Sequence, residues 1–335
     1  MRITKDLLHK FAQETVKQRK KDEPDLYAAY LTGSLLRDEP LLGGTTDIDL
    51  VLVHKYTAPI PRETEKVTRE ISYDIFHTVK TDYDQYRELR QDPWLGYPLT
   101  HYNIMLFDTD HWLEFIQASV NAEFHNVENV LVRSNKMLGN ARNHWFSLIQ
   151  AAPENHLEWL DHYLNVLELA VNAVLGLISP PLTTRRFMLD FQSRGDDLGV
   201  SKIFYGFKGL LGLSEDSKRD FKPWIAAFEQ TLDRLHQNEV IPVHLAPCRK
   251  SYYVDALHAL ADSGEPDQAT WPLLHTWVAV QRALGKENLP VKEWEDCLSA
   301  LNLDESGLGE KTEALDAYLD NAEIILESWA EAYGG

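Results

Sequence analysis

Short segments with alternating hydrophobic and polar positions occur repeatedly in the first 110 residues of the chain. A period of two predicts strands that bury one face, and a continuous apolar run predicts a strand buried on both faces. The strongest signal is the segment DIDLVLV, in which the alternation passes into an apolar run. The predicted strands are residues 26–32, 47–53, 71–77 and 103–107.

Two other segments of this region are predicted to be helical. Residues 4–20 have apolar positions at a helical period among polar ones. Residues from about Arg62 to Arg69 follow a loop with two prolines and are interpreted as a second helix. The region is thus expected to be a mixed domain of helices and strands that ends near residue 110.

The second half of the chain has a different pattern. From His111 onward, strand signals nearly vanish, and long helical patterns follow that are interrupted at proline and glycine positions. The length of 335 residues also exceeds what one average domain needs. The sequence therefore predicts an α+β fold, with a small mixed-sheet domain at residues 1–110 and an all-helical bundle at residues 111–335.

Charge and composition narrow the classes of function. The formal net charge of −19 argues against a nucleic-acid partner, whose phosphates would require many Lys and Arg contacts. The acidic excess lies mainly in the second half, where it serves solubility or attracts a cationic substrate. No apolar stretch approaches the roughly 20 residues of a membrane span, and no signal-peptide pattern is found, so we expect a cytoplasmic protein.

Three aspartates carry the most specific chemical signal. Asp47 and Asp49 are one residue apart on a predicted strand, so their side chains point to the same face. Two carboxylates beside an apolar run repel each other unless cations neutralise them, and oxygen ligands suit Mg²⁺ or Mn²⁺. Asp74 lies on a separate predicted strand of the same sheet. A third carboxylate makes a site for two metal ions plausible.

A glycine and a serine directly follow the first predicted strand. Gly33 lets the backbone turn sharply and lets phosphate oxygens approach the amide groups, and Ser34 can donate a hydrogen bond to a phosphate. An Asp-x-Asp pair or a Gly-Ser pair alone is weak evidence. The combination is more specific: twelve residues separate Ser34 from Asp47, and Asp74 follows Asp49 by 25 positions.

These segments resemble a known signature. Leu31-Thr32-Gly33-Ser34, Asp47-Ile48-Asp49-Leu50 and Tyr73-Asp74-Ile75 are similar to the motifs of the DNA-polymerase-β-type nucleotidyltransferase superfamily, in the same order and strand context. The resemblance covers roughly residues 25–110. With a helical domain after the catalytic one, the chain resembles the aminoglycoside (kanamycin) nucleotidyltransferase branch.

The resemblance implies a reaction and its cofactors. A hydroxyl of a small acceptor, cationic as in an aminoglycoside, attacks the α-phosphate of a nucleoside triphosphate, with ATP expected, and pyrophosphate leaves. Asp47 and Asp49 are expected to bridge two Mg²⁺ ions, and Asp74 to bind the ion that polarises the hydroxyl. Gly33 and Ser34 would bind the triphosphate. The chain departs from the family in having few evident triphosphate-binding cations, for which Arg37 is a candidate and a surface role the alternative.

The helical half supplies a candidate general base. On the predicted helix 161–178, Asp161, Asn165, Glu168 and Asn172 form one polar stripe that faces either water or a cleft. Some aminoglycoside nucleotidyltransferases use a glutamate of the helical domain as a base, and Glu168 is the matching position. The resemblance also implies a role in antibiotic resistance, and it allows a homodimer whose cleft is completed across the interface.

Other classes of function remain open at this point. A protein- or RNA-directed nucleotidyltransferase, of the AMPylating or cyclic-oligonucleotide type, has a similar site motif, although the acidic charge argues against RNA. A non-catalytic nucleotide-binding protein is expected to have lost one of the three carboxylates, and all three are present. A glycosyltransferase that uses the Asp-x-Asp pair leaves Gly33-Ser34 unexplained.

Overall fold

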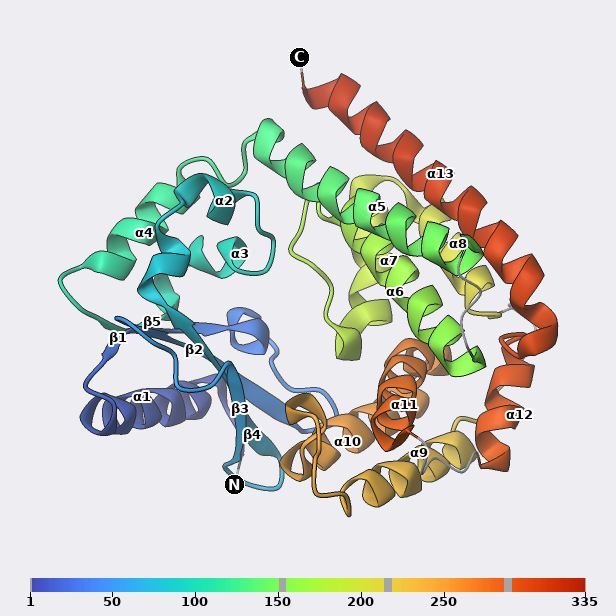
Figure 1. The fold of residues 1–335 in the computed structure, drawn as a ribbon, viewed down its shortest axis with the longest axis horizontal. Coiled ribbons are helices and arrows are strands. Elements are labelled where there is room, and N and C mark those ends of the chain that lie inside the picture. The colour runs from blue at the N-terminus through green and yellow to red at the C-terminus, as the bar shows by residue number, and fades with distance from the viewer. Residues whose placement is uncertain (1, 151–154, 214–218, 286–290, 335) are drawn as a thin grey trace. The chain divides into compact units, whose positions relative to one another are not determined.

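The protein has the predicted α+β fold, in which a mixed sheet near the N-terminus is followed by a largely helical region (Figure 1). No helix of the described residues is long and apolar enough to cross a membrane. The computed structural model describes residues 2–150, 155–213, 219–285 and 291–334.

The sheet has five strands in the order β3-β4-β2-β1-β5. β2 and β4 are parallel neighbours, whereas the other neighbouring pairs are antiparallel. The strands predicted at 26–32, 47–53 and 71–77 are confirmed, and the fourth begins two residues later than predicted. The bounds are β1 Leu26–Thr32, β2 Thr46–His54, β3 Arg62–Lys66, β4 Ile71–Val79 and β5 Met105–Asp108.

The helix predicted at about residues 62–69 is wrong, because this segment contains strand β3. β3 pairs with β4 so that Arg62 lies opposite Phe76 and Lys66 opposite Ser72. Glu and Lys favour helices when isolated, but the hydrogen bonds to β4 outweigh this preference, and charged residues are common on an edge strand. The correction places Arg62 on the strand next to Asp74.

Helix α1 (Lys5–Asp22) covers one face of the sheet (Figure 1). It begins at Thr4, whose side chain accepts a hydrogen bond from the backbone N–H of Leu7 at 3.3 Å. Its apolar stripe of Leu8, Ala12 and Val16 is buried in the core with the inner residues of β1 and β2. This packing fixes α1 against the sheet.

The chain divides into two compact units at places that differ from the predicted boundary at residue 110. Met1–Asn129 and Pro242–Ala256 form the first unit, and the remaining residues form the second. Helix α4 (Trp112–Asn121) belongs to the first unit because its apolar residues are buried in the core around the sheet. The returning segment 242–256 belongs to it because its first turns contact β3.

The remaining helices are short in the first unit and longer in the second. In the first unit they are α2 (Tyr86–Arg90) and α3 (Gly96–Leu99). Helix α10 (Lys250–Ala261) begins in the returning segment and continues into the second unit. The others are α5 (Val127–Gln150), α6 (His156–Leu175), α7 (Phe187–Leu198), α8 (Ser201–Leu210), α9 (Lys222–Leu235), α11 (Thr270–Leu284), α12 (Lys292–Ala300) and α13 (Leu308–Tyr333).

Candidate metal and nucleotide site

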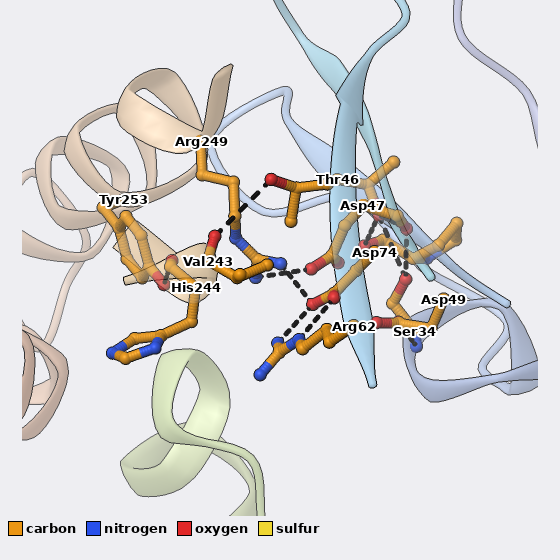
Figure 2. A network of polar contacts seen from close by, with 12 residues as sticks. Ser34, Thr46, Asp47, Asp49, Arg62, Asp74, Val243, His244, Arg249 and Tyr253 are labelled. Carbon is orange, nitrogen blue, oxygen red and sulfur yellow. Dashed lines mark hydrogen bonds and ion pairs between the residues drawn. The ribbon is translucent and has the colours of Figure 1, made fainter. Parts of the chain in front are cut away.

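The three predicted aspartates come together on β2 and β4 (Figure 2). Asp47 and Asp49 lie on the same face of β2, and the parallel register places Asp49 opposite Asp74. One carboxylate oxygen of each residue lies within 4.8 Å of the others, which is a spacing that could hold a metal ion. Asp47 and Asp74 are buried, whereas Asp49 is partly buried. We call these three residues the aspartate triad.

The turn after β1 contacts the triad directly. Thr32 pairs with Asp49, so the next residue, Gly33, lies over the Asp49 carboxylate. The backbone N–H of Ser34 donates a hydrogen bond to Asp49 Oδ2 at 3.2 Å. The Ser34 hydroxyl donates to the carbonyl of Asp47 at 3.1 Å and shares a hydrogen bond with Thr46. The predicted proximity of Gly33 and Ser34 to the aspartates is thus present in the structure.

Gly33 is required at this position for two reasons, and Gly33→Ala tests both. Its φ angle is +63°, and a Cβ atom there would lie 1.9 Å from Asp49 Oδ2. We expect this change to lower the free energy of unfolding by about 3 kcal/mol, because left-handed strain and displacement of the carboxylate add together. Urea unfolding measures the effect.

Gly44 provides the matched control for this substitution. It also has a positive φ, of +75°, but a Cβ atom there would meet nothing within 4 Å. Gly44→Ala should therefore show the strain alone, about 1 kcal/mol. Equal losses for the two variants would contradict the inferred collision with Asp49.

Two arginines surround Asp74. Arg62 on β3 donates to both Asp74 oxygens, from Nε at 2.7 Å and from Nη2 at 2.5 Å. Arg249 lies where the turn Pro247–Arg249 meets α10, and its two terminal nitrogens bind Asp74 Oδ2 and Asp47 Oδ2, the latter at 2.8 Å. Figure 2 shows the two guanidinium groups approaching the triad from β3 and from the returning segment. Cationic groups thus already neutralise part of the triad.

Arg249 packs against two tyrosine rings. Its guanidinium lies over the rings of Tyr252 and Tyr253, with centroids at 4.6 and 5.8 Å. Tyr253 is itself fixed by a hydrogen bond from its hydroxyl to the carbonyl of His244 at 2.6 Å. Burial disfavours the charged guanidinium, but Tyr253 and the aspartates outweigh it and raise the pKa of Arg249. Arg249 is therefore a permanent cation in this environment.

The carboxylates of the triad differ in their preferred protonation state. Burial, and then the charges of Asp47 and Asp74, raise the pKa of Asp49 well above its usual range. Burial also acts to raise the pKa of Asp74, but the hydrogen bonds from Arg62 and the charge of Arg249 outweigh it and lower that pKa. Three ionised carboxylates exceed the two guanidiniums by one negative charge, and the raised pKa shows that Asp49 bears a negative charge least favourably.

Asp49→Asn should stabilise the metal-free protein at neutral pH. The pKa of Asp49 is higher in the folded protein than in the unfolded chain, where it is about 3.9. Protonated Asp49 therefore stabilises the folded protein at pH values below about 3.9, and this stabilisation is lost as the pH rises through the pKa of Asp49 in the folded protein. Asparagine is neutral throughout, so the variant should gain about 0.5–2 kcal/mol at neutral pH, and the gain should shrink as the pH falls. Urea unfolding in a chelator across this pH range measures it.

An exposed aspartate of the same unit serves as the reference for this prediction. Asp84 is exposed, and Asp84→Asn should change the free energy of unfolding by no more than about 0.5 kcal/mol. A metal-free Asp49→Asn protein that is less stable than wild type at neutral pH would show that the Asp49 charge is compensated.

The contacts of Arg37 and Glu168, the two other predicted site residues, neither support nor contradict their predicted roles. The backbone N–H of Arg37 donates to the Ser34 carbonyl at 3.1 Å, and its carbonyl accepts a hydrogen bond from Lys5 Nζ at 2.7 Å. Glu168 lies on α6 in the second unit, where its carboxylate is 3.2 Å from His275 Nε2. The triphosphate contact of Arg37 and the basic role of Glu168 remain predictions.

The polar stripe on α6 has partners within the second unit. Asp161 pairs with Arg282 at 2.6 Å, and the side chain of Asn172 accepts a hydrogen bond from the backbone N–H of Leu182 at 2.7 Å. Asn172 is also buried, so this end of the stripe does not face water. The sequence analysis considered only water or a cleft as the surroundings of this stripe. The structure shows a third arrangement, in which Asp161 and Asn172 contact neighbouring segments of the second unit.

The sequence interpretation missed Arg62 and Arg249. Arg62 begins a segment of five polar residues, 62–66, which has no alternation of apolar and polar positions that could have marked the strand. Arg249 is followed by a lysine, a serine and two tyrosines, and nothing in this pattern links it to aspartates 175 and 202 residues away. Only the fold brings it to the triad.

The site consists of three carboxylates, a glycine turn and two arginines, all within the first unit. Comparison of the chain with protein-family models gives no match, and comparison with curated proteins gives none either.

Proposed function

We propose that the protein is a Mg²⁺-dependent nucleotidyltransferase that transfers a nucleoside monophosphate, from ATP in the first instance, to a hydroxyl of a small acceptor. The observation that carries the proposal is the aspartate triad on two parallel strands, next to the Gly33-Ser34 turn. In the reaction, the acceptor oxygen forms a bond to the α-phosphorus, the bond from that phosphorus to the bridging oxygen breaks, and pyrophosphate leaves.

The donor set fits Mg²⁺. Carboxylate oxygens are hard ligands. Burial, and then the charges of Asp47 and Asp74, raise the pKa of Asp49, and a divalent cation would relieve this repulsion. Asp47 and Asp49 would hold both ions, and Asp74 would hold the ion nearer the acceptor. Bound Mg²⁺ supplies charge stabilisation for the entering and leaving oxygens.

Arg62 and Arg249 are proposed to pair with the aspartates in the absence of Mg²⁺ and with phosphate oxygens in its presence. Arg249 binds an oxygen of Asp47 and one of Asp74, so its guanidinium would compete with Mg²⁺ for these carboxylates and would have to leave them for the ion to bind. Arg249 and Arg62 would then be available to bind phosphate oxygens of the triphosphate through their planar guanidiniums. This arrangement supplies the cations that the sequence did not reveal. Arg37 is proposed as a further phosphate ligand.

The other residues bind and orient the reactants. The Gly33-Ser34 turn lies beside Asp49 and is proposed to bind phosphate oxygens. Asp74 orients the acceptor hydroxyl, and Glu168 accepts its proton. The net charge of −19 favours a cationic acceptor, such as an aminoglycoside, over nucleic acid. The proposed location is the cytoplasm, where nucleoside triphosphates are available.

Pyrophosphate release tests this function. The four nucleoside triphosphates are supplied with Mg²⁺ and a panel of aminoglycosides, other polyols, proteins and RNA, and release is followed with a coupled assay. Acceptor-dependent release by the wild-type protein supports a small-molecule transferase and identifies its substrate class. Release only with protein or RNA acceptors would support the macromolecule-directed alternative, and nucleotide binding without release would support a binding protein.

A further inference from the structure

A second cluster of side chains that could hold a metal ion lies on the opposite face of the sheet. Residues alternate between faces along a strand, so His54 on β2 and His77 on β4 point away from the triad. This is the face of α1, because Tyr73, which shares it with His77, accepts a hydrogen bond from Thr15 of α1 at 2.7 Å. Glu23, at the C-terminal end of α1, completes the cluster.

The three side chains have the spacing of metal ligands. His54 Nε2 lies 2.9 Å from His77 Nδ1 and 3.9 Å from Glu23 Oε2, and the three ligand atoms are within 4.8 Å of one another. Donor atoms of a tetrahedral zinc site lie about 3.3 Å apart, as follows from bonds of about 2.0 to 2.1 Å. Small side-chain shifts convert the observed distances into that geometry.

A carboxylate already orients one of the histidines. His77 Nε2 lies 3.1 Å from Glu63 Oε1, and the carboxylate can only accept, so this nitrogen carries the proton. The lone pair of His77 Nδ1 then points toward His54. Histidines that bind metals usually donate their other N–H to a carboxylate, which fixes the tautomer and the ring orientation. Glu63 provides this contact for His77.

The cluster also has an excess of negative charge. Arg19 of α1 pairs with Glu23 at 2.9 Å, with Glu63 at 2.7 Å and with Glu65, so one cation faces three carboxylates. With both histidines neutral, these groups sum to −2, and a divalent ion restores neutrality. Burial, and then the neighbouring His77, lower the pKa of His54, which favours its neutral, metal-binding form.

One atom of the cluster lacks a partner. Glu23 Oε2 is buried and accepts no hydrogen bond from residues 2–150, 155–213, 219–285 or 291–334. A buried carboxylate oxygen in this state costs free energy unless something binds it. It lies on the side of Glu23 nearest to His54 Nε2. A cation between the two atoms would satisfy both.

We propose that Glu23, His54 and His77 form a Zn²⁺ site that fastens the C-terminal end of α1 to β2 and β4. Glu63 is the residue that positions His77, and a water molecule completes four ligands. Two nitrogens and one carboxylate oxygen suit Zn²⁺ better than Mg²⁺, which prefers oxygen ligands. The site is structural and independent of the aspartate triad.

The test is a calorimetric titration of Zn²⁺ into metal-stripped protein carrying Asp47→Asn and Asp49→Asn, so that the triad does not compete. One equivalent should bind, and Zn²⁺ should raise the melting temperature. Adding Glu23→Gln or His54→Ala should weaken binding more than about a hundredfold, and Glu63→Gln about 10- to 100-fold. Co²⁺ should give the visible absorption of a tetrahedral site.

Glu14→Gln on the same helix is the control, because Glu14 is exposed and paired only loosely with Lys10 at 3.9 Å. It should leave Zn²⁺ affinity unchanged. Circular dichroism establishes that each variant is folded, and Glu23→Gln, which keeps a hydrogen-bond acceptor for Arg19, guards against a loss of folding in His54→Ala. Absence of Zn²⁺ binding, or binding that Glu23→Gln leaves unchanged, would overturn the proposal.

Discussion

Replacing Asp47 and Asp49 together by asparagine is expected to lower acceptor-dependent pyrophosphate release at least about a thousandfold. The two residues supply the shared oxygens of the proposed Mg²⁺ site, and loss of metal stabilisation at the phosphorus removes about 4 kcal/mol or more of transition-state stabilisation. The fold should persist, since asparagine has nearly the same shape as aspartate and Asp49→Asn alone is expected to stabilise it. Initial rates at saturating nucleotide measure the loss.

Removing the same charge elsewhere in the first unit provides the control. Asp84 and Glu88 are exposed, and the double variant Asp84→Asn/Glu88→Gln should retain wild-type release. An Asp47→Asn/Asp49→Asn protein that still releases pyrophosphate within about tenfold of wild type would refute a metal role for the triad. Activity and stability should thus change in opposite directions at Asp49, as expected for a residue selected for function.

Arg249→Ala is expected to lower the free energy of unfolding of the metal-free protein by about 3–5 kcal/mol. The substitution leaves Asp47 and Asp74 buried without one of their two cations, and an unpaired buried charge carries a penalty of this size. Mg²⁺ should recover most of the loss, because it neutralises the same oxygens, and it should bind the variant about tenfold more tightly than wild type. Urea unfolding with chelator and with Mg²⁺ measures both effects.

Arg69→Ala is the matched control for Arg249→Ala. Arg69 also pairs with an aspartate across the same unit, Asp255, at 3.2 Å, but its side chain is 70% exposed. Exposed pairs contribute about 0–1 kcal/mol, so this variant should lose little, and Mg²⁺ should stabilise it no more than it stabilises wild type. If Arg249→Ala behaved in the same way, the guanidinium would not be the counter-charge of the triad.

The part of the site that depends on local sequence pattern was predictable. The segment DIDLVLV fixes which residues of β2 share a face, and therefore that Asp47 and Asp49 lie together. The glycine after β1 marks a turn, and its positive φ angle agrees with that interpretation. The sequence analysis assumed that Asp74 lies in the same sheet as Asp47 and Asp49. The pairing of β2 with β4 confirms this assumption.

The part that depends on long-range contacts was not predictable. Residues 62–66 have a composition that suits a helix, and only the hydrogen bonds to β4 make them a strand. Arg249 approaches the triad because the segment 242–256 returns to the first unit, which no local period encodes. The contacts of Glu168 likewise depend on how α6 and α11 pack. Local sequence patterns thus predict individual helices and strands, whereas the arginines that neutralise the triad are brought to it only by tertiary structure.

The return of residues 242–256 to the first unit has a consequence for biosynthesis. Asp74 and Arg249 are 175 positions apart, so at 5 to 20 residues per second the ribosome takes roughly 10 to 35 seconds to add the arginine after the aspartate. Throughout that interval the nascent sheet carries its aspartates without their main counter-charge. Arg62 is the first cation available to the nascent chain, and cellular Mg²⁺ is the next. The final docking step of the first unit therefore waits until three quarters of the chain has been translated.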